Sequence, residues 1–196
     1  MAEWSEWFEN TATGERARIC RDPRDDGAMV NELVVATGSK GPPPHMHPGQ
    51  DEHFVVQSGV FAGRIGRKRF EARAGEAVFA ERMVPHAWWN GSDTEELRLL
   101  CTTTPALRLE KVLRGGWEIM SRMGPGVKPP VLMMAVVCDE YRGEMGLPMP
   151  LWIQRPLVSV LAKAGRRRYG WVLDDPATWT DDRFEKWRPA EGAPRG

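Results

Sequence analysis

The sequence lacks the features that mark several classes of protein. Its longest apolar run, "VLMMAVVC" at 131–138, is far shorter than the about 20 residues that a membrane-spanning helix needs. The acidic opening "MAEWSEWFENTATGER" has no apolar core typical of a signal peptide, which predicts a cytoplasmic location. Lys and Arg together number 27, as do Asp and Glu, so the net charge is zero and no nucleic-acid partner is indicated.

Cysteine is also scarce. The three cysteines, Cys20, Cys101 and Cys138, are odd in number and widely spaced, which argues against a disulfide framework and a Cys-x-x-Cys metal site. We expect them to be buried, reduced thiols, in keeping with a cytoplasmic protein. A length of 196 residues suffices for one domain with a substantial core, with or without an appendage.

The first half of the chain predicts a protein that is mainly β. Its short segments are rich in Val, Phe, Trp, Ile and Thr and are bounded by Gly, Pro, Asn or Asp. Gly59, Gly66 and Gly75 have the nearly even spacing of turns in a barrel or sandwich, and "GRKR" at 66–69 predicts a tight hairpin. The expected strands are 15–22, 31–38, 52–59, 60–66, 68–75, 76–81, 86–91 and 96–104.

After Pro105 the pattern becomes helical. Apolar residues at three- and four-residue steps predict a helix over 106–123. A buried helix is expected over 131–145, with Gly146 at its end. A third is expected over 151–165, kinked or restarted at Pro156. The predicted organisation is a barrel over 1–104, a helical extension over 105–170 and a charged tail over 171–196.

The placement of the histidines points to chemistry. Three of the four lie within nine positions, and His45 and His47 are two residues apart, so both rings face the same side of an extended strand. The Pro-Gly pair at 48–49 predicts a turn that brings Glu52 back toward them on the next strand. His86 follows about three strands later and can become their neighbour in a closed barrel.

Three imidazoles and one carboxylate make a strong site for a divalent transition metal such as Fe, Mn, Ni, Cu or Zn. We therefore predict His45, His47, Glu52 and His86 as metal ligands. An isolated histidine in a β domain is usually a surface or core residue, but the joint spacing of this set favours ligands. His53 follows Glu52 directly and should face the opposite way, so we assign it a structural role.

The spacing resembles the first of the two motifs of the cupin family. That motif runs Gly, five residues, His-x-His, three or four residues, Glu, six residues, Gly. The chain has His45, His47, Glu52 and Gly59 at these positions, and only its leading glycine, Gly38, lies one position early.

The second cupin motif runs Gly, five residues, Pro-x-Gly, two residues, His, three residues, Asn. Here Gly75, His86 and Asn90 are in register, whereas Glu81 and Met83 occupy the Pro and Gly positions. The turn before His86 therefore departs from the family pattern.

The resemblance covers about residues 30–104, with the motif core at 38–91. It implies a double-stranded β-helix, the cupin jelly-roll barrel, with a metal bound inside. Because no long low-complexity linker separates the barrel from the C-terminal helices, we expect these helices to pack on the barrel or to mediate self-association. If His86 and Glu52 face inward, residues two and four positions after each of them face the same interior. For Trp88, a place in the barrel core is as good an interpretation as contact with a substrate. The pocket wall is expected to include Phe54, Val56, Phe79, Trp88 and Asn90.

Two kinds of function fit this site. One is an enzyme, a metal-dependent oxygenase or a related lyase or isomerase, that acts on a small organic molecule. No separate general base is evident, and we interpret Asp51 as a solvated turn residue. The other is a cupin that binds a small ligand, as a sensor or binding module, without turning it over. The predominantly apolar pocket wall leans slightly toward the second.

The segment "PLWIQRPLVSVLAKAGRRRYGW" has apolar residues followed by a basic cluster. It suits either attachment to a membrane surface or a core-packing helix with a solvated basic end, and we favour the second. Barrel edges and apolar helix faces need covering, which predicts a homodimer whose interface the sequence does not assign.

Overall fold

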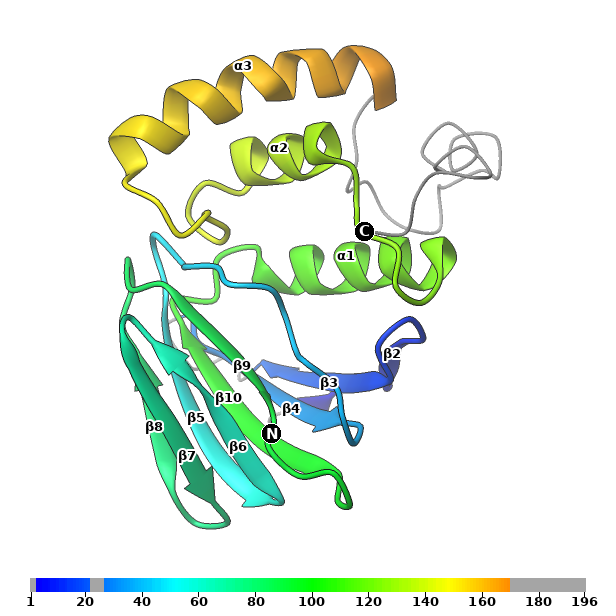
Figure 1. Cartoon of the computed structure of the whole chain (residues 1–196), viewed down its shortest axis with the longest axis vertical. Coiled ribbons are helices and arrows are strands. Elements are labelled where there is room, and N and C mark those ends of the chain that lie inside the picture. The colour runs from blue at the N-terminus through cyan, green and yellow to red at the C-terminus, as the bar shows by residue number, and fades with distance from the viewer. Residues whose placement is uncertain (1–2, 22–26, 170–196) are drawn as a thin grey trace.

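Residues 3–21 and 27–169 of the chain are described by a computed structural model, in which two β-sheets are capped by a layer of helices (Figure 1). The strands are β1 (Glu3–Trp4), β2 (Phe8–Asn10), β3 (Glu15–Arg21), β4 (Met29–Val35), β5 (Asp51–Ser58), β6 (Val60–Ile65), β7 (Lys68–Arg73), β8 (Ala77–Ala80), β9 (His86–Asn90) and β10 (Leu97–Thr104). The helices are α1 (Leu109–Met123), α2 (Val131–Glu140) and α3 (Leu151–Tyr169).

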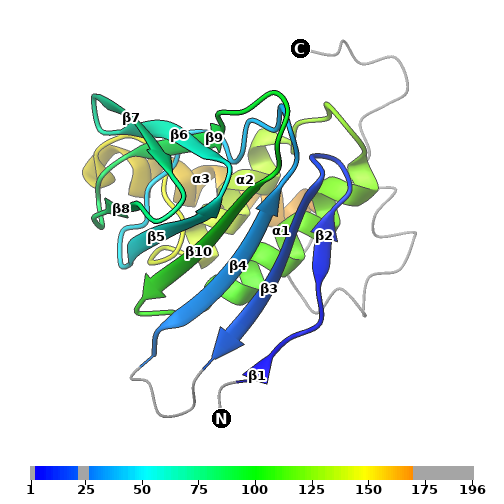
Figure 2. The same cartoon turned by 90° about the horizontal axis from the view of Figure 1, so that it is seen from below.

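The larger sheet has the order β1-β3-β4-β10-β5-β8, with β2 paired to β3, and the smaller sheet has the order β7-β6-β9 (Figure 2). All pairings are antiparallel. This architecture agrees with the predicted double-stranded β-helix. Each of the eight expected strands overlaps an observed one, whereas the short strands β1 and β2 were not predicted.

Tight turns connect the strands where the glycines predict them. Gly59, Gly66 and Gly75 all have positive φ angles, which L-residues with a side chain rarely adopt. Ile65 pairs with Lys68, so the predicted hairpin closes through a two-residue loop. These turns set the register that decides which side chains enter the barrel.

An apolar core fills the space between the two sheets. Phe54 of β5, Phe61 of β6 and Trp88 of β9 meet there, with ring centroids 5.1 Å apart for Phe54 and Phe61 and 5.9 Å apart for Phe61 and Trp88. Leu99 of β10 is fully buried among them. Burial of these large side chains holds the sheets face to face.

A second core joins the larger sheet to the helices. Ile19 of β3 and Met29 of β4 pack with Leu109 and Val112 of α1, and Figure 1 shows that α1 lies next to the strands whereas α3 lies farthest from them. Helix α3 approaches α2 closely, because a Cβ added to Gly165 would lie 2.4 Å from the carbonyl oxygen of Leu132. The helices thus pack on the barrel, which is one of the two arrangements expected from the sequence.

The helices differ from the prediction at three ends, because α1 begins three residues later than expected, α2 ends earlier and α3 extends to Tyr169. Helix α2 ends at Glu140 instead of 145, and the following segment turns back toward the barrel. Helix α3 continues through Pro156, so of the two expected outcomes, a kink or a restart, the restart was wrong. Trp152, whose carbonyl loses its helical donor to the proline, is 78% exposed, so water can satisfy that carbonyl.

The outer face of α3 is apolar and exposed, with Trp152, Leu157 and Val160 facing away from α2, whereas Val158 and Ala162 are buried. The predicted homodimer and the membrane alternative remain predictions. None of the described helices is both long and apolar enough to cross a membrane. The predicted tail at 171–196 lies outside the described residues.

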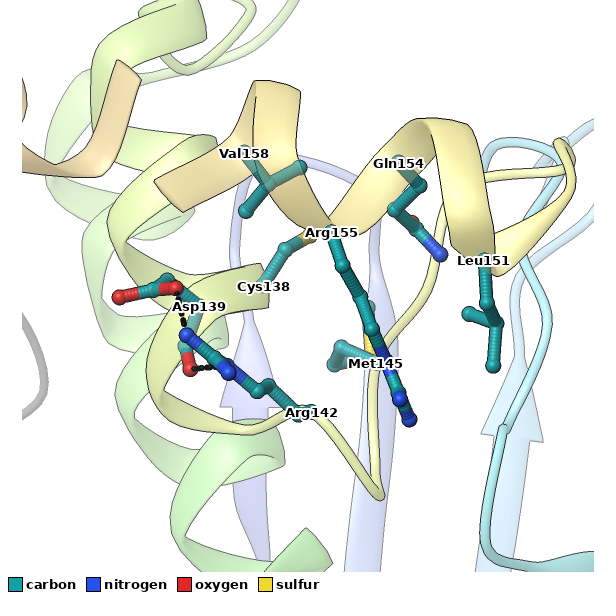
Figure 3. A pocket seen from close by; sticks show the side chains of 8 residues that line it. All are labelled: Cys138, Asp139, Arg142, Met145, Leu151, Gln154, Arg155 and Val158. Carbon is teal, nitrogen blue, oxygen red and sulfur yellow. Dashed lines mark hydrogen bonds and ion pairs between the residues drawn. The ribbon is translucent and has the colours of Figure 1, made fainter. Parts of the chain in front are cut away.

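A shallow pocket lies between α2 and α3 (Figure 3). At its edge Asp139 accepts hydrogen bonds from Ser159, at 2.9 Å, and from Arg166, at 2.7 Å. Its lining residues are Cys138, Asp139, Arg142, Met145, Leu151, Gln154, Arg155 and Val158. The pocket therefore belongs to the helical layer and includes none of the four predicted metal ligands.

Candidate metal centre

The four predicted ligands converge at one end of the barrel. His45 and His47 lie in the segment before β5, Glu52 near the start of β5, and His86 at the start of β9. The backbones of His45 and His86 exchange two hydrogen bonds, of 3.0 and 2.8 Å, which bring the His-x-His segment beside β9. One candidate ligand atom from each residue lies within 4.8 Å of the other three.

The turn at 48–49 places Glu52 on the same side as the histidines. Glu52 pairs across the sheet with Ala80 and Thr103, and all three are buried. Its Oε2 lies 3.4 Å from Nε2 of His47 and 3.1 Å from Nε2 of His86. The carboxylate therefore points into the group of imidazoles.

Backbone carbonyls fix the orientation of all three rings. Nδ1 of His45 lies 2.9 Å from the carbonyl of Pro43, Nδ1 of His86 lies 3.0 Å from that of Val84, and Nδ1 of His47 hydrogen-bonds to that of Glu144. A carbonyl only accepts, so each Nδ1 must donate, and a neutral ring then carries a bare lone pair on Nε2.

When the rings are neutral, the atoms that point into the centre of the cluster are therefore all hydrogen-bond acceptors. Nε2 of His47, Nε2 of His86 and Oε2 of Glu52 are buried and lack a hydrogen-bond partner. Acceptor atoms this close repel one another unless a cation, either a proton or a metal ion, lies between them. This environment fits a metal that takes nitrogen and oxygen ligands.

The pKa values agree with this arrangement. Burial, reinforced by the two neighbouring imidazoles, lowers the pKa of His45 to about 3, so this ring is neutral at physiological pH, as a ligand must be. Burial works against the charged forms of Glu52 and His47, but their mutual attraction outweighs it. The pKa of Glu52 is therefore well below its usual range and that of His47 is raised. A proton held by this pair would be displaced by a metal ion.

The other oxygen of Glu52 is held by a thiol. Sγ of Cys101 lies 3.8 Å from Oε1 of Glu52 and 3.8 Å from the hydroxyl of Thr103. Burial, followed by the charge of Glu52, raises the pKa of Cys101 well above its ordinary value. The thiol therefore stays protonated and donates a weak hydrogen bond that orients the carboxylate. As predicted, all three cysteines are free and buried.

Most residues predicted to line the pocket are buried, but they are committed to other contacts. Phe54, Val56 and Trp88 belong to the apolar barrel core. The amide nitrogen of Asn90 donates to the carbonyls of Val35, Ala36 and Glu95 at 3.2, 3.3 and 2.7 Å. Trp88 is therefore part of the barrel core, the alternative that the sequence left open. Asn90 connects β9 to the end of β4 and to the loop before β10.

The prediction that Phe79 lines the pocket was wrong. Phe79 is 52% exposed and pairs with His53 on the outer face of the sheet. Strand alternation explains this result, because Glu52 and Phe54 face inward opposite Ala80 and Val78, which leaves Phe79 on the outside. His53 is exposed there and faces away from the buried Glu52, as predicted.

The turn before His86 forms without the proline and glycine of the second cupin motif. Met83 occupies the glycine position and takes a φ of +67°, the conformation that a glycine adopts without strain. Its N–H donates to the carbonyl of His47 at 3.0 Å. Asp51 accepts a hydrogen bond from the N–H of Arg82, at 2.7 Å, which supports the same turn and agrees with the turn role predicted for Asp51.

Sequence reasoning missed Glu144, which contacts His47, and Arg108, which holds Glu144 in place. Glu144 supplies the carbonyl that holds His47, and Arg108 binds the carboxylate of Glu144. Both lie in the helical extension, beyond either motif. The one local signal was Gly143, which interrupts the helix expected over 131–145.

Comparisons with known proteins agree with the motifs. Residues 31–103 match the model of the family described as Cupin domain. The structure is similar to an RmlC-like cupin of Shewanella frigidimarina, with 18% identity over 56% of this chain and 89% of the other and a TM-score of 0.46. It is also similar to KdgF of a Halomonas species, with 18% identity over 52% of this chain and 84% of the other and a TM-score of 0.42.

A search of curated proteins finds no match to this chain. The family match covers β4 through most of β10 and includes all four candidate ligands. Its position agrees with the two motifs and with the observed jelly roll. Residues 31–103 of the barrel are therefore a cupin domain.

Proposed function

We propose that this cupin binds one divalent transition-metal ion through His45, His47, Glu52 and His86 and acts as a metal-dependent oxygenase on a small organic molecule. One observation carries the proposal. Buried acceptor atoms from His47, Glu52 and His86 face one another without a hydrogen-bond donor between them. A bound cation removes that conflict.

The residues of the chain would hold the metal and control access to it. The Nδ1–carbonyl hydrogen bonds fix each ring with Nε2 inward, and the Cys101 thiol fixes Glu52. Among the four, only His45 is partly exposed, so we expect a small molecule to enter on its side. A bound metal would supply Lewis-acid and redox chemistry at that point.

A second candidate is a cupin that binds a ligand without turning it over. The character of the neighbouring side chains favours it, because Phe54 and Val56 offer neither acid nor base. The Cys101 thiol has a strongly raised pKa and is unsuited to proton transfer near neutral pH.

Oxygen uptake distinguishes the two candidates. The full chain is reconstituted anaerobically with Fe(II) or Mn(II) and then exposed to oxygen with phenols, flavonols, diketones or thiols. The oxygenase proposal predicts uptake above that of free metal with at least one substrate class, and loss of that uptake in His86→Ala. Uptake no faster than free metal across the whole panel, with metal bound, would refute the oxygenase and leave the binding module.

A further inference from the structure

The helical extension reaches the candidate metal centre through the segment 143–146. Gly146 and Met46 exchange backbone hydrogen bonds of 2.9 and 3.0 Å, and the N–H of Gly49 donates to the carbonyl of Gly143 at 2.7 Å. Between these contacts the carbonyl of Glu144 accepts the hydrogen bond of the His47 ring. The segment 143–146 therefore contacts the backbone before and after His47 as well as the His47 ring.

The side chain of Glu144 anchors this segment. It is only 3% exposed, and its Oε1 accepts hydrogen bonds from the backbone N–H and the Nε of Arg108, each at 3.1 Å. The Arg108 guanidinium also lies 4.5 Å from the ring centre of Tyr141. Charge-assisted hydrogen bonds to a buried carboxylate are among the stronger ones in proteins, so this pair fixes where the Glu144 backbone lies.

His47 is the exception among the three histidines. The rings of His45 and His86 donate to carbonyls two residues away, at Pro43 and Val84, so their orientation is set locally. The acceptor for His47 lies 97 residues away in the sequence. Its orientation consequently depends on the docking of the helical extension.

We infer that Glu144 and Arg108 are positioning residues for the metal centre, so that docking of the extension and metal binding favour each other. This inference rests on the proposed metal site. A ring held by a hydrogen bond from its outer nitrogen presents its inner nitrogen at a fixed angle, and loss of such outer contacts typically lowers metal affinity about 10- to 100-fold. By linkage, the metal stabilises the docked segment to the same extent.

The test measures Co(II) binding to the full chain by chelator competition and by visible absorption. Glu144→Gln keeps the shape of the side chain but weakens its hold on Arg108, and we expect affinity to fall about tenfold with a changed Co(II) spectrum. Glu118→Gln is the matched control, because it removes a similar glutamate–arginine pair, with Arg122 at 2.7 Å, within helix α1. The control should keep the wild-type affinity and spectrum.

Hydrogen exchange of the wild type gives a second readout that needs no variant. Co(II) should slow exchange of the Gly49 and Gly146 amides, which bridge the barrel and the extension. Equal affinity and spectrum in Glu144→Gln and wild type, or unchanged exchange at these amides on metal binding, would overturn the inference and leave the proposed metal site standing. A wild type that binds no Co(II) would overturn both.

Discussion

The carboxylates of the helical layer and of the barrel have different partners. In the helical layer the buried Glu144 pairs with Arg108, and the partly buried Asp139 pairs with Arg142 and Arg166. In the barrel Glu52 faces imidazole nitrogens, two of which lack hydrogen-bond partners. The carboxylates of the helical layer are therefore balanced by arginines of the chain, whereas Glu52 is balanced by imidazoles alone, where we propose that a metal ion binds.

A third arrangement sharpens this contrast. Glu15 in β3 is 5% exposed and receives hydrogen bonds from the hydroxyls of Thr13, at 2.9 Å, and Ser39, at 3.3 Å. Burial raises the pKa of Glu15 despite these hydrogen bonds. A buried carboxylate without a cation thus tends to take up a proton, whereas the pKa of Glu52 is lowered.

The largest expected effect comes from removing the anion of the candidate metal centre. Glu52→Gln leaves the three imidazoles in place but loses the charged ligand, so affinity for Zn(II) should fall by more than about a hundredfold, beyond the usual loss for an outer contact. Chelator competition measures the change. An affinity within a few-fold of wild type would place the metal elsewhere.

The matching change in the helical layer should affect stability and leave metal affinity unchanged. Asp139→Asn weakens the hydrogen bonds from Arg166 and Ser159 of α3, which help to hold α3 against α2, and we expect a loss of about 1–2 kcal/mol in the free energy of unfolding at neutral pH. Urea unfolding measures this loss.

The pH dependence of that loss follows from the pKa of Asp139. Burial opposes ionisation, but Arg166 and Arg142 outweigh it and lower the pKa from 3.8 to about 2. The unfolded state takes up the proton first as pH falls, so the stabilisation is present above 3.8 and disappears toward about 2. A difference between wild type and variant that stays constant from neutral pH to about pH 3 would contradict this account.

The smallest effect is expected at Glu15, and it has the opposite sign. Because the pKa of Glu15 is raised in the folded state, the wild type loses stability as pH rises from 4.5 toward that pKa. Glu15→Gln removes the ionisation and should stabilise the protein by about 1 kcal/mol at neutral pH, with no gain below about pH 4. Thermal unfolding at both pH values checks this; destabilisation of equal size at both would contradict it.

Much of the barrel could be predicted because local patterns determine it. The strand alternation in β5 and β9 and the turns at Gly59 and Gly75 specify which side chains face inward, and they brought His45, His47, Glu52 and His86 together as expected. The prediction for Phe79 was wrong because the register between β5 and β8 decides which face of the sheet Phe79 occupies. That register depends on pairing across the sheet, which local patterns do not show.

The role of the helical extension could not be predicted from local patterns. The run at 131–145 has a good helical pattern, but its last residues leave the helix to pair with the segment around Met46. Contacts between positions about 100 residues apart, such as His47 with Glu144, leave no periodic trace in a single sequence. Likewise, nothing local indicates that α3 exposes Trp152 and Leu157.

Isothermal titration of the chelator-treated full chain with Zn(II) at neutral pH tests the central claim most directly. The account predicts saturable binding of one ion per chain, accompanied by proton release and lost in a His47→Ala, His86→Ala double variant. Absence of saturable binding in the wild type, or unchanged binding in the double variant, would contradict it.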